Sequence, residues 1–188
     1  MFVGKRVRLA PVRRDDLEQF AAWFSDPEVT TFMAPDVLRL FSYDDEVAWY
    51  EDMRKDKDLF TFAIRTLDDD QLLGNCGLRV NAWRNRSAVF GIVIGNKLYW
   101  GRGYGTEATR LLLEYGFGEL NLNRVELEVF AFNTRAIRSY EKVGFVHEGA
   151  RRQALYRNGA YHDIYIMGLL CQEWFAKQPP SGHNPGGQ

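Results

Sequence analysis

The sequence has few of the residues that build metal sites and disulfide frameworks. Of its 188 residues only two are cysteines, Cys76 and Cys171, and only three are histidines, His147, His162 and His183. The cysteines lie far apart and no apolar signal segment opens the chain, so we expect buried thiols rather than a disulfide. The histidines lack metal-ligand spacing. The sequence therefore predicts a protein without a bound metal.

Two further absences narrow the class of protein. Lys and Arg total 24 against 25 Asp and Glu, so no basic excess indicates a nucleic-acid partner. No uncharged apolar run is long enough to span a bilayer. With no targeting segment at the N-terminus, we expect a cytoplasmic protein that binds neither nucleic acid nor membrane.

The length of the chain suits one domain with a sizeable core. We expect that domain to cover residues 1–175. The remaining stretch, 176–188, is rich in Pro, Gly and polar residues, which is typical of a disordered tail. No internal repeat is evident.

The most informative stretch, residues 99–108, carries alternating glycines at Gly101, Gly103 and Gly105. A short β-branched run at 88–94 precedes it, and apolar residues at helical spacing follow. The pattern predicts a turn from a buried strand into a helix. Such a turn leaves backbone N–H groups unpaired at the positive end of the helix dipole. We therefore expect a phosphate site there.

The glycines alone do not identify the phosphate ligand. No Lys-Ser or Lys-Thr follows them, which argues against a P-loop. Gly103, Gly105 and Ala108 fit a dinucleotide fingerprint, and Glu126 and Glu128 stand at a suitable distance to bind a ribose hydroxyl. A dinucleotide-binding oxidoreductase is therefore one alternative.

A second motif, residues 133–145, reads Asn-Thr-Arg-Ala-Ile-Arg-Ser-Tyr-Glu-Lys-Val-Gly-Phe. It predicts a short helix with Asn133 as N-cap and Gly144 at its C-terminal end. Together with the glycine turn, it resembles the GCN5-related N-acetyltransferase (GNAT) superfamily. The subgroup that it resembles contains ribosomal-protein N-terminal acetyltransferases and their spermidine and antibiotic acetyltransferase relatives. The resemblance runs from about residue 5 to residue 170.

The resemblance implies acetyl-CoA as co-substrate. By this analogy the turn binds the pyrophosphate through its backbone N–H groups, the preceding strand pairs with the pantetheine arm, and Tyr140 is the general acid. Tyrosine suits that role because its phenol is protonated at neutral pH. The implied cofactor-binding residues are Ile92, Val93, Ile94, Gly101, Arg102, Gly103, Tyr104, Gly105, Thr106 and Asn133.

The sequence departs from the family at Val89, where many relatives carry a glutamate that serves as the base. Valine cannot accept a proton, so another group must do so, unless the amine arrives neutral or water removes its proton. The sequence leaves several substitutes open, namely Glu126, Glu128, His147, His162 and Asp163.

Two helices are expected before the glycine turn. Asp15 or Asp16 should cap the first, and Ser42 with Asp45 resembles a capping box for the second. The apolar residues between them, in 28–41, show no clear period. They form either a buried connection or the wall of a substrate pocket.

Alternating patterns and turns predict an antiparallel meander, one crossover and a final hairpin. The expected strands after a first strand near Val7 are 59–64, 72–78, 88–94, 124–130, 145–156 and 161–170. The right-handed crossover rule makes 88–94 and 124–130 parallel neighbours. With the resemblance, we expect an α/β (α+β) fold in which about four helices flank a mixed, mostly antiparallel sheet of about seven strands with a splayed parallel pair. A dinucleotide fold would instead offer successive βα units.

The sequence thus predicts direct acetyl transfer from acetyl-CoA to a primary amine, since neither motif contains a cysteine. The acceptor is a protein N-terminus, a polyamine or an antibiotic-like small molecule, and by analogy the chain can form a homodimer. A polycationic acceptor calls for an acidic cleft, to which Asp36, Asp44, Asp45 and Glu46 could contribute. The loss of the glutamate at Val89 leaves a non-catalytic acyl-CoA-binding protein as a second alternative.

Overall fold

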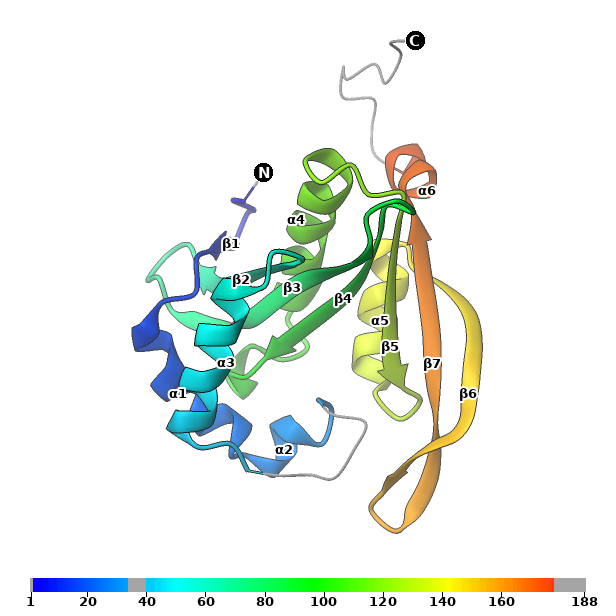
Figure 1. The fold of residues 1–188 in the computed structure, drawn as a ribbon. Helices are drawn as coiled ribbons and strands as arrows, with labels where there is room; N and C mark the ends of the chain where they lie inside the picture. The colour runs from blue at the N-terminus through cyan, green and yellow to red at the C-terminus, as the bar shows by residue number, and fades with distance from the viewer. Residues whose placement is uncertain (1, 34–39, 178–188) are drawn as a thin grey trace.

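The computed structural model describes residues 2–33 and 40–177, and its centre is a seven-stranded mixed sheet (Figure 1). The strands lie in the order β1-β2-β3-β4-β5-β7-β6, and only β4 and β5 pair in parallel among the described strands. This confirms the predicted fold. The strands are β1 (Val7–Ala10), β2 (Leu59–Thr66), β3 (Leu72–Ala82), β4 (Ser87–Ile94), β5 (Arg124–Phe130), β6 (Val146–Arg157) and β7 (Ala160–Leu170).

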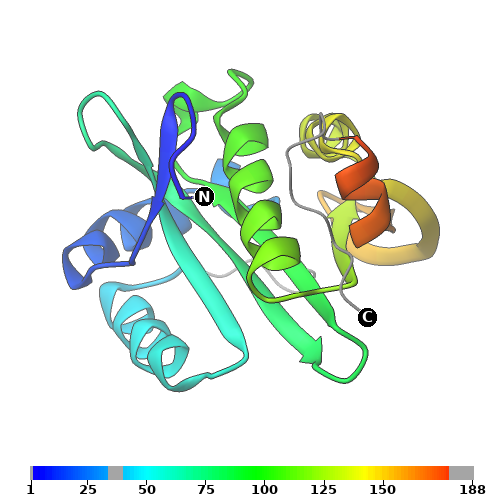
Figure 2. The same ribbon diagram turned by 90° about the horizontal axis from the view of Figure 1, so that it is seen from above.

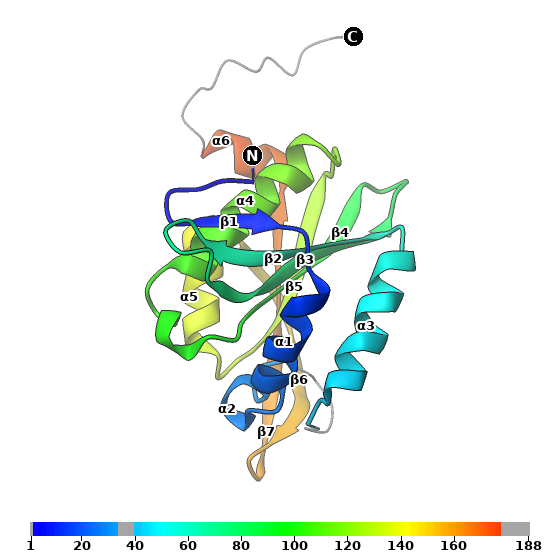
Figure 3. The same ribbon diagram turned by 90° about the vertical axis from the view of Figure 1, so that its left-hand side faces the viewer.

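Helices cover both faces of the sheet. In Figure 2, α1 and α3 lie on one face and α4 on the opposite one, and Figure 3 shows the same division from the side. The α-helices are α1 (Leu17–Phe24), α2 (Pro27–Thr30), α3 (Tyr43–Lys55), α4 (Tyr104–Gly118), α5 (Thr134–Val143) and α6 (Cys171–Ala176). No helix in the described part of the chain is long and apolar enough to cross a membrane.

The parallel strands β4 and β5 separate soon after they meet. They pair only at Ser87↔Arg124, Ala88↔Val125 and Val89↔Glu126. Beyond this point β4 stays paired with β3 and β5 stays paired with β7, so neither strand can close the opening. The backbone of β4 from Phe90 onward therefore faces an opening in the middle of the sheet.

The two faces of the sheet have separate cores. The larger core lies under α4 and α5 and includes the fully buried side chains of Leu78, Leu112 and Leu127. A smaller core, which includes Leu17 and Phe20, packs beneath α1 and α3. The β5 residues Val125, Leu127 and Val129 are buried in the larger core, so Glu126 and Glu128 point to the face that carries α1–α3.

Two capping signals were predicted for the helices before the glycine turn, one for α3 and one for α1. Ser42 and Asp45 form a capping box, in which the Asp45 amide donates to Ser42 Oγ at 3.2 Å. Asp16 stands at the N-cap position of α1, as one of the two predicted alternatives, but its side chain makes no cap hydrogen bond to that helix. The buried Asp16 carboxylate instead accepts a hydrogen bond from the Arg13 amide at 2.9 Å and pairs with the Arg65 guanidinium.

The short helices α2 and α6 were not predicted. The helix α2 falls in the segment without clear periodicity, where Pro27 at its first turn and the Asp26 side chain fix its start. The helix α6 extends through Ala176, so regular structure reaches beyond the expected boundary at residue 175. Residues 178–188 of the predicted tail lie outside the described residues.

Glu46 is the one buried side chain of α3 and is only 3% exposed. Among the described residues, none forms an ion pair or hydrogen bond with its carboxylate. Burial, with a smaller contribution from Asp45, raises the pKa of Glu46 from 4.5 to about 7. The protonated carboxyl therefore stabilises the fold below pH 4.5, and this stabilisation is lost as the pH rises to 7.

We expect Glu46→Gln to melt several degrees above the wild type at pH 8, because the neutral amide removes an ionisation cost of about 3 kcal/mol. At pH 5 the two proteins should melt together. Thermal unfolding followed by circular dichroism at both pH values checks this. Asp52→Asn, at an exposed position of the same helix, serves as control and should show no such pH-dependent gain. Equal melting temperatures at pH 8 would contradict the prediction.

Candidate functional site

The glycine turn lies at the start of α4. Gly101 and Gly103 have φ values of 71° and 86°, which side chains disfavour, and Gly103 caps the helix without a side chain. Among the described residues, none accepts a hydrogen bond from the amides of Gly101 through Thr106. Unpaired amides at the positive end of a helix dipole are able to bind an anion such as a phosphate.

Glu107 fixes this turn to the N-terminal segment. Its Oε1 accepts hydrogen bonds from the amides of Lys5 at 2.5 Å and Arg6 at 2.8 Å, and its Oε2 accepts one from Arg6 Nε at 3.0 Å. Arg6 also donates to the Arg102 carbonyl at 2.8 Å. Burial raises the pKa of Glu107, but these hydrogen bonds outweigh burial and leave the pKa below its usual value. The turn is thus held by a fully ionised carboxylate.

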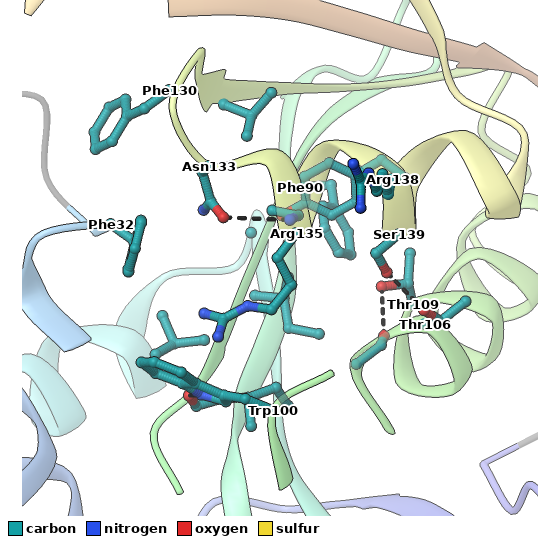
Figure 4. Close-up of a pocket in the computed structure, with 18 of the residues that line it drawn as sticks. Phe32, Phe90, Trp100, Thr106, Thr109, Phe130, Asn133, Arg135, Arg138 and Ser139 are labelled. Atoms are coloured by element: carbon teal, nitrogen blue, oxygen red, sulfur yellow. Dashed lines mark hydrogen bonds between the residues drawn. The ribbon is translucent and has the colours of Figure 1, made fainter. Parts of the chain in front are cut away.

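Hydrogen bonds also join the start of α4 to α5. The hydroxyls of Thr106 and Ser139 lie 2.7 Å apart (Figure 4). Arg110 donates to the carbonyl of Lys142 at 2.5 Å. The anion site and the second sequence motif therefore lie side by side, as the resemblance implies.

A cleft of about 690 Å³ runs from the glycine turn along the opening between β4 and β5. It collects most of the predicted site residues, which are Ile92, Val93, Ile94, Gly101, Gly103, Gly105, Thr106, Asn133 and Tyr140. Arg102 and Tyr104 do not line it. The Tyr104 ring packs edge-on against Tyr99 at 5.0 Å and lies under the Arg6 guanidinium at 4.8 Å. The contribution of Tyr104 to the site is therefore its backbone amide.

Tyr140 reaches the cleft from α5. Its ring packs edge-on against Phe90 at 5.8 Å and Phe145 at 5.9 Å, and it is 9% exposed. Burial raises the pKa of Tyr140 well above its usual value. The phenol therefore keeps its proton at neutral pH. Asn133 caps α5 by accepting a hydrogen bond from the Ala136 amide at 3.2 Å, and it also lines the cleft.

Of the candidate bases, Glu128 is the one that lines the cleft in the described part of the chain. Its carboxylate also pairs with Arg151 of β6. The other four candidates do not line the cleft and have contacts outside it. Glu126 forms an ion pair with Arg124 at 3.0 Å, and the His147 ring lies 3.4 Å from the Glu141 carboxylate. The His162 ring packs against the Phe132 ring at 4.9 Å, and the Asp163 carboxylate accepts a hydrogen bond from the Gln153 amide at 2.9 Å. Val89 lines the cleft where a glutamate stands in many relatives.

Arg135 is a site residue that the sequence did not single out. Its guanidinium lies 3.8 Å from the Trp100 ring centre and 5.6 Å from that of Phe32 (Figure 4). The Trp100 indole donates to the Ile94 carbonyl at 2.6 Å, which fixes the ring. Partial burial lowers the pKa of Arg135, which nevertheless stays charged. In the sequence, the one feature that could have pointed to Arg135 as a site residue was its position within the second motif, residues 133–145.

The segment after α1 supplies part of the cleft wall. Val29, Phe32 and Met33 line it, which confirms the pocket alternative for this part of residues 28–41. In contrast, Phe41 packs against Phe24, at 6.3 Å between ring centres. Residues 34–39, with Leu38, lie outside the described residues.

The three described acids proposed for an acidic cleft do not line the cleft. Asp44 is exposed on α3, Asp45 belongs to the capping box, and Glu46 is buried. Asp36 lies outside the described residues. No cluster of metal-ligand side chains is present in the described ranges.

A phosphate-binding turn, a splayed parallel strand pair and a buried phenol in one cleft define an acyl-carrier-dependent transferase. The chain matches the family model of the acetyltransferase (GNAT) domain over residues 6–146. It therefore belongs to the GNAT family and is an N-acetyltransferase. This family assignment, together with the antiparallel meander, leaves no support for the dinucleotide alternative.

Several relatives extend the family assignment. The chain is 30% identical over 171 residues to the uncharacterized N-acetyltransferase p20 of Bacillus licheniformis, a match that covers 90% of this chain and 96% of p20. It is 37% identical over 121 residues to the putative ribosomal N-acetyltransferase YdaF of Bacillus subtilis, covering 64% and 66%. The crystal structure of spermidine N-acetyltransferase from Vibrio cholerae, in complex with CoA and spermine, superposes with a TM-score of 0.82 at 25% identity, covering 90% and 98%.

We expect Glu107→Gln to lower the melting temperature by several degrees and to weaken acetyl-CoA binding severalfold. The neutral amide loses the charge-assisted bond to Arg6 and places an N–H group against other donors. Thermal unfolding and isothermal titration with acetyl-CoA measure the two effects. Glu114→Gln, at an exposed position of the same helix, should leave both unchanged. Unaltered affinity in Glu107→Gln would show that the contact does not hold the turn.

Proposed function

We propose that this protein transfers an acetyl group directly from acetyl-CoA to a primary amine, with Tyr140 as general acid and Glu128 as proton acceptor. The observation that carries the proposal is the meeting of three features in one cleft. These are the unpaired amides of residues 101–106, the exposed backbone of β4 and the buried phenol.

The residues present fit acetyl-CoA. The free amides of the glycine turn match a pyrophosphate, and Arg138 and Lys142 line the adjacent cleft with positive charge. The β4 backbone beyond Val89 lacks a β5 partner and can pair with the amides of the pantetheine arm. Acetyl-CoA supplies the activated thioester, and the protein orients it against the amine.

Proton transfers at two residues balance the reaction. Glu128 takes the proton that the amine loses as the nitrogen attacks the thioester carbonyl. The carbon–sulfur bond then breaks, and Tyr140 donates its proton to the departing thiolate. The products are the N-acetylated amine and free CoA. Tyr140 regains a proton from solvent and Glu128 releases its proton to solvent, so both residues return to their starting states.

No covalent acyl-enzyme is needed. Cys76 is buried on β3, where burial strongly raises the pKa of its thiol, and Cys171 lies at the start of α6. Neither cysteine lines the cleft. The described cleft thus contains no thiol nucleophile, and the acetyl group passes to the amine in one step.

Replacing Tyr140 by Phe should lower kcat at least about a hundredfold, because the thiolate would leave unprotonated. Acetyl-CoA affinity should stay the same, since Phe keeps the ring contacts with Phe90 and Phe145. Thiol release across an amine panel gives kcat, and titration calorimetry gives the affinity. Tyr115→Phe, in an aromatic cluster outside the cleft, is the matched control. A variant with full activity would exclude Tyr140 as the acid. A wild type that binds acetyl-CoA yet acetylates no amine would favour a binding protein.

Glu128→Gln should reduce kcat/KM for the amine by about one to two orders of magnitude near neutral pH. At pH 9 to 10 the difference should narrow, because more of the amine is already deprotonated. The pH profile of kcat/KM for both proteins measures this. Glu126→Gln, on the same strand but paired with Arg124, should keep the wild-type profile. A constant loss at every pH would mean that Glu128 only binds or positions the substrate.

A further inference from the structure

We infer that Arg135 determines which amines this enzyme accepts, and that the acceptor carries a carbonyl or carboxylate oxygen beside its amine, as an α-amino acyl group does. A polyamine is then a poor substrate. The inference rests on the proposed function and specifies its acceptor. Three observations carry it: the charge of the described cleft lining, the position of Arg135 and the absence of an acidic partner for it among the described residues.

The cleft is cationic. Among the described lining residues, one carboxylate, Glu128, stands against three cations, Arg135, Arg138 and Lys142. Glu128 is already paired with Arg151. A polyamine brings several ammonium groups, and each group that leaves water needs a negative partner. Glu128 can serve the reacting amine, but no further carboxylate of the described lining remains for the other ammonium groups.

The three cations do not face the same part of the cleft. Arg138 and Lys142 follow Arg135 on α5 and lie beside the start of α4, where Ser139 contacts Thr106. They are placed to meet the phosphates of the cofactor. Arg135 lies in the first turn of α5 and points toward Trp100 and Phe32, the latter next to α2. Its charge is therefore directed to the acceptor side.

Arg135 is held in place without a carboxylate. No acidic side chain of the described residues pairs with it, whereas other cleft-side charges such as Glu128 have partners. The Arg135 guanidinium carbon lies 3.8 Å from the Trp100 ring centre, and the ring is itself fixed by its bond to Ile94. A guanidinium has five N–H donors, and its contact with an aromatic face does not use them as a carboxylate would. Such a group is ready to bind an oxygen of a ligand.

The distance from the proposed acid suits a compact acceptor. Arg135 and Tyr140 belong to the same helix, α5, and both line the cleft. In an α-amino acyl group a single carbon separates the amine from the carbonyl. The amine can therefore reach the thioester near Tyr140 while the oxygen contacts Arg135.

The test measures binding to the enzyme–CoA complex by titration calorimetry, so that it does not depend on turnover. Alanine amide is compared with isopropylamine, in which a methyl group replaces the carboxamide, and with spermidine. We expect wild type to bind alanine amide at least about tenfold more tightly than either. Arg135→Gln should abolish this preference, Arg135→Lys should keep part of it, and Arg135→Glu should shift it toward spermidine.

Two further arms complete the design. The first compares the affinities of free alanine and trialanine amide, which shows whether the amino acyl group belongs to a free amino acid or to a peptide N-terminus. Tighter binding of either one supports the inference. Arg152→Gln removes the same charge from an exposed position on β6 and should leave all affinities unchanged. Melting temperature and CoA affinity confirm that each variant is folded.

Three results would overturn the inference. The first is wild type binding spermidine as tightly as alanine amide. The second is Arg135→Gln weakening CoA binding tenfold while the acceptor preference persists, which would make Arg135 a cofactor contact. The third is no binding of any amine at millimolar concentration. Failure of the proposed function would give a different result. The binding preference for alanine amide would still be lost in Arg135→Gln, but acetyl-CoA would release no thiol with any amine.

Discussion

The rest of the site depends on the early separation of β4 from β5. Had the parallel pair continued past Val89, the β4 backbone would have been satisfied within the sheet and no cleft would exist. Because each strand keeps its outer partner, the opening is rigid rather than frayed. The same divergence places the start of α4 at the end of β4, and α5 directly after β5. The elements that carry the anion site and Tyr140 are thus set by strand pairing.

The sheet also separates two tasks. Its α4–α5 face supplies unpaired amides and cations, which suit a highly anionic carrier. The opposite face, with α2 and the segment after it, supplies aromatic and apolar wall residues such as Phe32 and Met33. The opening joins the two faces, so that a carrier and an acceptor can meet through the sheet.

How much the sequence predicts depends on how local each signal is. The glycine turn, the Asn133 cap and the Ser42 capping box lie within a few residues, and each was correctly placed. Features that join distant segments were missed, as with Asp16, whose partner Arg65 is remote in sequence. Arg135 went unrecognised for the same reason, because its stacking on Trp100 spans 35 residues. Glu128 could be chosen among the acids only once two features were known from the structure, namely that Glu126 pairs with Arg124 and where β4 and β5 separate. The hydrophobic periodicity of the sequence encodes neither feature.

The contact between Glu107 and the amides of Lys5 and Arg6 has a consequence for how the protein is made. It joins positions about 100 residues apart, 102 for Lys5 and 101 for Arg6. On a ribosome that adds roughly 5 to 20 residues per second, the segment with Lys5 and Arg6 waits roughly 5 to 20 seconds for its carboxylate partner. During that interval β1 also lacks its pairing strand, β2, until residue 66 is available. This segment is therefore fixed only after the chain has been made through Glu107, and the glycine turn gains its contact with Arg6 only when the two segments dock.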